Sequence, residues 1–359
     1  MAASDRLAVT EPPMSRPFVM TVRGPVDPTE LGRTLIHEHL QMDARPLLKA
    51  HGYRATATGP FDVAAASEAR WNPGAHPDNY RLDDPELIAR ELRPFVEAGG
   101  RTIVDVTPPE LGRNPAGLRR ISEMTGVHVV MGTGHYLKAV HPNWLERADE
   151  DTIAERIVEE WRSGVRPDGI RPGIIGEIGT GDPIDPAERR VLRGAAMASR
   201  RTGMSISVHL QPWGRTGVPI LDELELSGAD PQRVILGHLN TAHDDQPYVA
   251  SLLSRGVWLA FDLFGFDHSL LGLGRYPPSD ADVATTVVRL VEAGYGGQLL
   301  ISGDLGVRSR LHASGGWGYD HVLRHVVPLL RARGLDAPTI DRLLIENPAR
   351  VLTIEDPLI

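Results

Sequence analysis

The sequence predicts an α/β fold and, within that class, a (β/α)8 TIM barrel. Three observations predict it: eight short apolar runs can be strands, amphipathic segments separate most of them, and five of the eight runs end on a histidine or a carboxylate. In such barrels the functional side chains stand at the carboxyl ends of the strands. A doubly wound parallel sheet is the alternative, because it repeats the same βα unit.

The eight strand candidates are rich in valine, isoleucine and leucine. In chain order they cover residues 33–40, 101–107, 127–133, 172–178, 204–210, 233–239, 257–263 and 298–304. The stretch between the first two, residues 41–100, is too long for an ordinary βα connection and is polar and rich in turn signals. We therefore expect a long insertion after strand 1.

Helix signals occupy most of the remaining intervals. The clearest helix begins with Asp185 as the N-cap, Pro186 at the first helical position and Glu188 at the third, and it ends at Gly203. Other helical segments also end at a glycine. For the whole chain we expect a flexible N-terminal leader over residues 1–17 and a single metal-dependent hydrolase barrel domain over residues 18–359.

The composition excludes several classes of function. The formal net charge of −9 argues against a nucleic-acid partner, which requires a basic face, and against binding to an anionic membrane surface. The absence of cysteine excludes disulfides, thiolate metal sites and cysteine nucleophiles. Since the N-terminus lacks the apolar core of a signal peptide, we expect a cytoplasmic protein. With nucleic acid and membrane disfavoured, we expect its partner to be a small-molecule substrate.

Six side chains of metal-ligand type stand at the ends of five strand candidates. A single histidine or carboxylate at such a position is commonly packed or hydrogen-bonded without a metal. Six of them at the same end of five strands argue against coincidence. They also exceed the four ligands that one zinc ion needs, so they predict two ions that share a carboxylate. The six predicted ligands are His37, His39, Glu177, His209, His238 and Asp304.

A site of this composition suits hydrolysis. Two divalent ions with two ionised carboxylates and four neutral histidines keep two net positive charges, or one when a hydroxide bridges the ions. Such a site generates hydroxide at neutral pH and stabilises an anionic transition state. Histidine and carboxylate donors favour Zn²⁺ here, with Mn²⁺, Co²⁺ and Fe²⁺ as alternatives.

Taken in order, the motifs of the chain resemble those of the phosphotriesterase family of the amidohydrolase superfamily. They are TLIHEHL, GIIGEIGT, SVHL, ILGHL, FDLFG, LLISGD, GGWGYDHVL and ENPAR, and they extend over nearly the whole chain. The resemblance is greatest to the phosphotriesterase-related branch, which has a glutamate metal bridge. It implies a barrel, hydrolysis by a metal-bridging hydroxide, and a homodimer.

The resemblance also implies how the ligands are shared between the ions. His37, His39 and Asp304 would hold the more buried ion, and His209 and His238 the more exposed one. Glu177 would bridge them. The best-known members use a carboxylated lysine as the bridge, but this chain has no lysine after Lys138.

Three further residues receive roles from the resemblance. Asp304 would take the proton from the bridging water as well as bind metal. Tyr136 matches a tyrosine that some lactonases of the family place beside the bridging hydroxide, and a position on the rim of the site is the alternative. Asp262 matches a family position at which a supporting role and a catalytic role are both open.

The substrate is less well defined. Leu263 and Thr241 replace the histidine and aspartate that relay protons in true phosphotriesterases, and Leu263 also replaces an arginine of many acyl-homoserine-lactone hydrolases. Three arginines in the loops could bind an anionic group, with solvated loop arginines as the alternative. The residues that we expect to contact substrate are Trp71, Trp213, Arg215, Phe264, Arg308 and Arg310.

The most concrete reading is a binuclear metal-dependent hydrolase of an amide, a lactone or an ester. An organophosphate hydrolase is the first alternative. A barrel that binds metal without catalysis is the second.

Overall fold

The computed structural model describes residues 16–269, 275–355 and 357. Apart from its last two residues, the predicted leader over residues 1–17 lies outside this part of the chain. Residues 18–21 are already part of the fold, because Phe18 pairs with Ile354 and β1 (Val19–Thr21) forms a short antiparallel ladder with β2 (Gly24–Val26).

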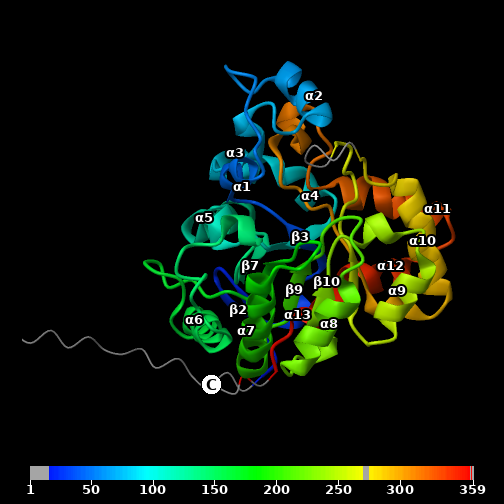
Figure 1. The fold of residues 1–359 in the computed structure, drawn as a ribbon. Helices are drawn as coiled ribbons and strands as arrows, with labels where there is room; N and C mark the ends of the chain where they lie inside the picture. The colour runs from blue at the N-terminus through cyan, green and yellow to red at the C-terminus, as the bar shows by residue number, and fades with distance from the viewer. Residues whose placement is uncertain (1–15, 270–274, 356, 358–359) are drawn as a thin grey trace, which may run out of the picture.

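An eight-stranded sheet forms a nearly closed barrel at the centre of the molecule (Figure 1). The strands follow one another around the barrel in chain order, which rules out the doubly wound alternative, and each ladder is parallel. They are β3 (Arg33–Glu38), β6 (Gly100–Asp105), β7 (His128–Thr133), β8 (Ile174–Gly179), β9 (Ile206–His209), β10 (Val234–Leu236), β11 (Trp258–Phe261) and β12 (Leu299–Ile301).

The last strand returns to the first through bonds just beyond its end. The Ser302 hydroxyl oxygen accepts from the backbone N–H of His37 at 3.1 Å, and the backbone N–H of Asp304 donates to the carbonyl of His37 at 3.1 Å. The Glu38 carboxylate accepts from the Ser302 hydroxyl and from the N–H groups of Gly303 and Leu305 at 2.7 to 2.8 Å. These bonds hold the β12 loop against the end of β3.

Helices cover the outside of the barrel. The predicted helix start is confirmed in α7, where Asp185 and Glu188 form a capping box, and Gly203 ends the helix with φ +74°. The covering helices are α5 (Pro115–Thr125), α6 (Glu150–Ser163), α7 (Pro186–Thr202), α8 (Gly217–Leu226), α9 (Gln246–Leu253), α10 (Asp280–Glu292), α11 (Val327–Ala332), α12 (Ala337–Asp341) and α13 (Asn347–Leu352). No helix of the described residues is both long and apolar enough to cross a membrane.

Between β3 and β6 the chain forms several short elements instead of one helix. In Figure 1 this part is blue to cyan, and α2 lies farthest from the barrel. An antiparallel pair joins β4 to β5 at the base of the segment. Its elements are β4 (Met42–Asp43), α1 (Arg45–Ala50), α2 (Val63–Trp71), β5 (Arg81–Leu82), α3 (Pro85–Glu91) and α4 (Arg93–Glu97).

Two apolar clusters lie on the two faces of the barrel sheet. The larger one joins strand residues such as Leu35 and Val129 to the apolar sides of the helices, so it lies outside the barrel. The smaller one contains Ile36, Val130 and Leu300, which alternate with the first set along the strands, so it fills the interior. The polar ligand residues lie beyond this apolar interior, at the carboxyl ends of the strands.

Several strands are shorter than predicted. The sequence predicts strands over residues 233–239 and 298–304, whereas β10 ends at Leu236 and β12 ends at Ile301. His238 and Asp304 lie within the predicted strands, but their φ values of +61° and +47° are incompatible with a strand.

Candidate metal centre

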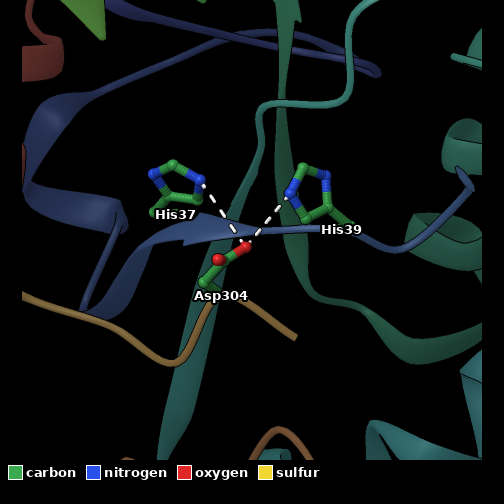
Figure 2. Close-up of side chains that lie close together, drawn as sticks. All are labelled: His37, His39 and Asp304. Carbon is green, nitrogen blue, oxygen red and sulfur yellow. Dashed lines mark ion pairs between the residues drawn. The ribbon is translucent and has the colours of Figure 1, made fainter. Parts of the chain in front are cut away.

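The six side chains that the sequence predicts as ligands lie together at the carboxyl end of the barrel. Figure 2 shows His37 and His39, from the end of β3, on either side of Asp304, from the loop after β12. One carboxylate oxygen of Asp304 lies 3.2 Å from Nε2 of His39 and 3.7 Å from Nε2 of His37. Five of the six residues are buried, and the Asp304 side chain is 16% exposed.

Glu177, from β8, lies at the centre of the group. Its Oε1 is 3.5 Å from Nε2 of His39, and its Oε2 is 3.5 Å from Nε2 of His37. The same Oε2 is 3.2 Å from Nδ1 of His209 and 3.8 Å from Nε2 of His238. The carboxylate therefore faces histidines of both predicted ion sites.

The distances between donor atoms suit metal ions. A tetrahedral zinc ion with bonds of about 2.1 Å keeps its ligand atoms about 3.4 Å apart. Donor atoms that are mutually close enough to share one ion occur in His37, His39 and Asp304, and again in His37, Glu177 and His238. Both clusters contain His37, so they form one continuous group of donors, which is consistent with a binuclear site but does not divide the six residues between two ions.

An unpartnered nitrogen supports the same interpretation. Nε2 of His37 is buried and has no hydrogen-bond partner, which costs free energy unless a cation satisfies it. Nε2 of His238 lies only 2.8 Å from Nδ1 of His209, so the two nitrogens share either a proton or a common cation. The residues present therefore fit a metal centre.

Supporting residues orient three of the histidines. Asp262, fully buried after β11, places one carboxylate oxygen 3.2 Å from Nδ1 of His37 and the other 3.0 Å from Nδ1 of His238. Nδ1 of His39 lies 2.8 Å from the Thr107 hydroxyl. A donor hydrogen on each Nδ1 leaves the Nε2 lone pair free to bind metal. Asp262, for which sequence reasoning left two roles open, thus contacts two predicted ligands from behind.

The carboxyl ends of β10 and β12 hold two ligands in a strained backbone. Positive φ is uncommon outside glycine, and His238 and Asp304 both adopt it. Asp262 accepts from the His238 N–H at 2.8 Å and holds this conformation in place.

The charges of the site shift the pKa of each group. For the protein side chains alone, burial lowers the pKa of His37, but Asp262, Glu177 and Asp304 outweigh burial and raise it to about 9. Burial raises the pKa of Glu177, but His37 and His209 outweigh it and hold the pKa well below its ordinary value. Burial and then the neighbouring His238 lower the pKa of His209.

Tyr136, which follows β7, reaches the same site. Its hydroxyl lies 3.2 Å from Nδ1 of His209, and the ring packs edge-on against the imidazole. Burial and then the charge of Glu177 raise the pKa of Tyr136 well above its ordinary value, so the phenol keeps its proton. Behind it, His135 lies 2.5 Å from Glu110, which also accepts from the Tyr136 N–H at 3.4 Å.

Sequence reasoning missed two buried carboxylates beside the ligands. Glu38 holds the β12 loop, as described above. Asp105, at the end of β6, accepts from the N–H of Leu40 at 2.6 Å and of Thr107 at 3.1 Å, and so fixes the chain directly after His39 and the segment whose Thr107 hydroxyl contacts the His39 ring. The detectable signal was an aspartate within the otherwise apolar run of residues 101–107.

A cavity of about 510 Å³ opens in front of the centre, and five of the six predicted ligands line it. The six residues expected to contact substrate are all described, and none of them lines this cavity. Trp71 is 73% exposed and lies beside Tyr276, and Phe264 is fully buried. Trp213 instead donates its backbone N–H to the Thr241 hydroxyl.

The three loop arginines also point elsewhere. Arg215 pairs with Asp245 at 2.8 Å, and the guanidinium of Arg308 lies over the ring of Phe61. Arg310 is 2% exposed, and its two terminal nitrogens donate to the carbonyls of Gly303, Asp304 and Phe264. It joins the start of the Asp304 loop to the loop after β11 and does not line the cavity.

Comparisons with known proteins agree with this site. The model of the phosphotriesterase family matches residues 17–352. An N-acetyltaurine hydrolase of Danio rerio is 32% identical over 342 residues, which cover 94% of this chain and 98% of the relative.

Two solved structures are also similar. A resiniferatoxin-binding protein from Rhodobacter sphaeroides is 40% identical, with a TM-score of 0.89 and coverage of 93% of this chain and 94% of the other. A mutant of a phosphotriesterase-like lactonase from Deinococcus radiodurans is 30% identical, with a TM-score of 0.75 and coverage of 93% and 99%.

Proposed function

Because the chain belongs to the phosphotriesterase family and is a hydrolase of that family, we propose that it cleaves a carboxyl derivative, namely an amide, a lactone or an ester, with two metal ions. The observation that carries the proposal is the position of Glu177, whose Oε1 faces His39 and whose Oε2 faces His37 and His209. His37, His39 and Asp304 would hold one ion, and His209 and His238 the other. Zinc is the metal that we propose.

The ions, when bound, would polarise the scissile carbonyl and lower the pKa of the attacking water. Asp304 is suited to accept the proton of that water: burial raises the pKa of Asp304, but the hydrogen bond from His39 and the charge of His37 outweigh burial and lower it, so the group is ionised. The same carboxyl would then return the proton to the leaving group. Tyr136, a neutral donor, would hydrogen-bond the oxygen on which negative charge develops.

Similarity to relatives supports a carboxyl derivative. Two of the similar proteins are named as a hydrolase of N-acetyltaurine and as a lactonase, and both names describe attack at an acyl carbon, whereas a third is named as a resiniferatoxin-binding protein. We interpret residues 41–99 as the predicted insertion, because this segment replaces a single βα connection and supplies Met42, Leu47, Tyr53 and Tyr80 to the cavity wall. The homodimer and the cytoplasmic location remain proposals, which size-exclusion chromatography and cell fractionation test.

A substrate panel with variants tests the function. Enzyme loaded with zinc, manganese or cobalt is assayed on an N-acyl amino acid, a lactone, an aryl ester and paraoxon. We expect hydrolysis of at least one of the first three, and a loss of about 10³-fold or more in kcat/KM for His37→Ala and Asp304→Asn. His128→Gln is the matched control, since this histidine stands at the amino end of β7.

The outcomes separate the alternatives. Turnover of paraoxon alone would favour the organophosphate hydrolase. Two bound metal ions without turnover of any compound would favour the non-catalytic barrel. Full activity of Asp304→Asn with metal present would remove Asp304 from the mechanism.

A further inference from the structure

We propose that the cavity accepts substrates whose portion remote from the scissile bond is uncharged and apolar, and that it rejects substrates with a carboxylate or sulfonate at that end. This inference rests on the proposed function, because it names the substrate class of the same site. It concerns the wall of the cavity and not its metal-binding floor.

Apolar side chains predominate on three sides of the wall, and Gln211 and His51 are polar residues of the lining. The segment between β3 and β6 contributes one side, the loop after β11 a second, and the loop after β12 a third. Side chains that represent these three sides are Met42, Leu47, Tyr53, Leu263, Phe266 and Val307. A volume of about 510 Å³ is enough for a drug-sized acyl group or leaving group.

No arginine or lysine is among the described residues that line the cavity. The carboxylates that line the cavity, those of Glu177 and Asp304, lie at its floor together with the predicted histidine ligands. Of the nearby cations, Arg215 is neutralised by Asp245, and Arg310 lies behind the ring of Phe266 and donates to backbone carbonyls. An anionic group at the wall would therefore find no partner for a bidentate ion pair.

The environment of His268 shows that a charged group is unfavourable at this wall. It lines the cavity, is 1% exposed, stacks on Phe266, and has no hydrogen-bond partner for its buried Nδ1. Burial, and then the charge of Arg310, lower the pKa of His268 to about 3, so the ring is neutral. An environment that keeps water from this imidazole also keeps water from a substrate carboxylate, which loses its hydration without compensation.

A matched pair of ligands tests the inference independently of turnover. A cyclopentanone with a heptyl chain resembles a lactone but cannot be hydrolysed, and its partner carries a carboxylate at the end of the same chain. Titration calorimetry with the zinc-loaded protein should give at least about 100-fold weaker binding of the carboxylate. Equal binding of the two, or tighter binding of the carboxylate, would overturn the inference.

A charge introduced at the rim provides the reciprocal test. His51 is exposed and lines the mouth of the cavity. His51→Arg should shift the ratio of affinities about tenfold toward the carboxylate, whereas His51→Gln should keep the ratio of the unmodified protein. An unchanged ratio in His51→Arg would contradict the inference.

Hydrolysis separates this inference from the proposed function. The corresponding lactones, with and without the terminal carboxylate, are assayed with the metal-loaded enzyme. Preferential turnover of the uncharged lactone supports both proposals. Turnover of both at equal rates overturns the substrate inference alone, and turnover of neither, together with preferential binding of the uncharged ketone, overturns the lactonase activity alone.

Discussion

At the scale of single residues, the buried carboxylate of Asp262 has a role that no local pattern reveals. It contacts Nδ1 of His37 through one oxygen and Nδ1 of His238 through the other. His37 and His238 are 201 positions apart in the numbering, and only the closed barrel brings them within reach of one side chain. Burial raises the pKa of Asp262, but His238 and His37 outweigh it and hold the pKa below its ordinary value.

Asp262→Asn should weaken metal binding by about 10- to 100-fold. The asparagine side chain has one acceptor oxygen where the aspartate has two. One of the two histidines therefore loses the acceptor that fixes the position of its ring hydrogen. Competition with a chelator, followed by metal analysis, measures the effect. Asp341→Asn, in an exposed pair with Arg33, is the control. Metal affinity that stays at the unmodified level in Asp262→Asn would show that the carboxylate does not orient the ligands.

At the scale of elements, α6 is tied to the barrel beside the active-site loop. Arg113, which precedes α5, donates to both carboxylate oxygens of Glu160 in α6 at 2.7 and 2.8 Å. The Thr133 hydroxyl, at the end of β7, donates to the same carboxylate at 2.6 Å. Burial raises the pKa of Glu160, but Arg113 outweighs it and lowers the pKa, so the pair is ionised. The loop that carries Tyr136 starts directly after this junction.

Glu160→Gln should lower the free energy of unfolding by about 1 to 3 kcal/mol, because it leaves a nearly buried guanidinium without its counter-charge. Urea unfolding followed by circular dichroism measures the change. Glu155→Gln, in the exposed pair with Arg201, should change stability by less than about 0.5 kcal/mol. If both substitutions cost the same, the junction is an ordinary surface pair.

At the scale of the whole molecule, the metal centre couples stability to pH. The pKa of His37 is raised to about 9, and those of His39 and His238 are raised as well. A raised folded-state pKa contributes stability that is fully present below the unfolded value of 6.5 and is lost as the pH rises through the folded value. Glu177 and Asp304 have lowered pKa values, so they change the folding stability only at acidic pH. Between pH 6.5 and pH 9 the change in stability therefore comes from the histidines.

The metal-free chain should therefore have a lower Tm at pH 9 than at pH 6.5. Zinc should oppose this trend, because metal binds the neutral imidazoles that higher pH provides, and it stabilises the state that it binds. Scanning calorimetry with a chelator or with zinc measures both curves. His37→Gln should flatten the metal-free curve, and a metal-free Tm that rises between pH 6.5 and pH 9 would contradict this linkage.

The sequence alone determined the barrel and the chemical type of the site. Apolar runs alternate with capped helices, and this pattern predicts parallel βα units. Such units bring the carboxyl ends of their strands to one face of the barrel whatever the loop conformations, so the six ligand-type residues at those ends were expected to lie together. The lack of lysine after Lys138 likewise left Glu177 as the bridge that the family resemblance requires. These conclusions depend on local pattern and on residue type.

Only the tertiary structure decided which side chains face the cavity. Arg310 and Arg215 read in the sequence as loop cations free to bind an anion, yet one binds backbone carbonyls and the other Asp245. The strand ends at His238 and Asp304 were also misplaced, since the N–H of His238 donates to Asp262 and the N–H of Asp304 donates to the carbonyl of His37, both in distant segments. Such contacts join residues far apart in the chain, so they follow from packing and not from local propensity.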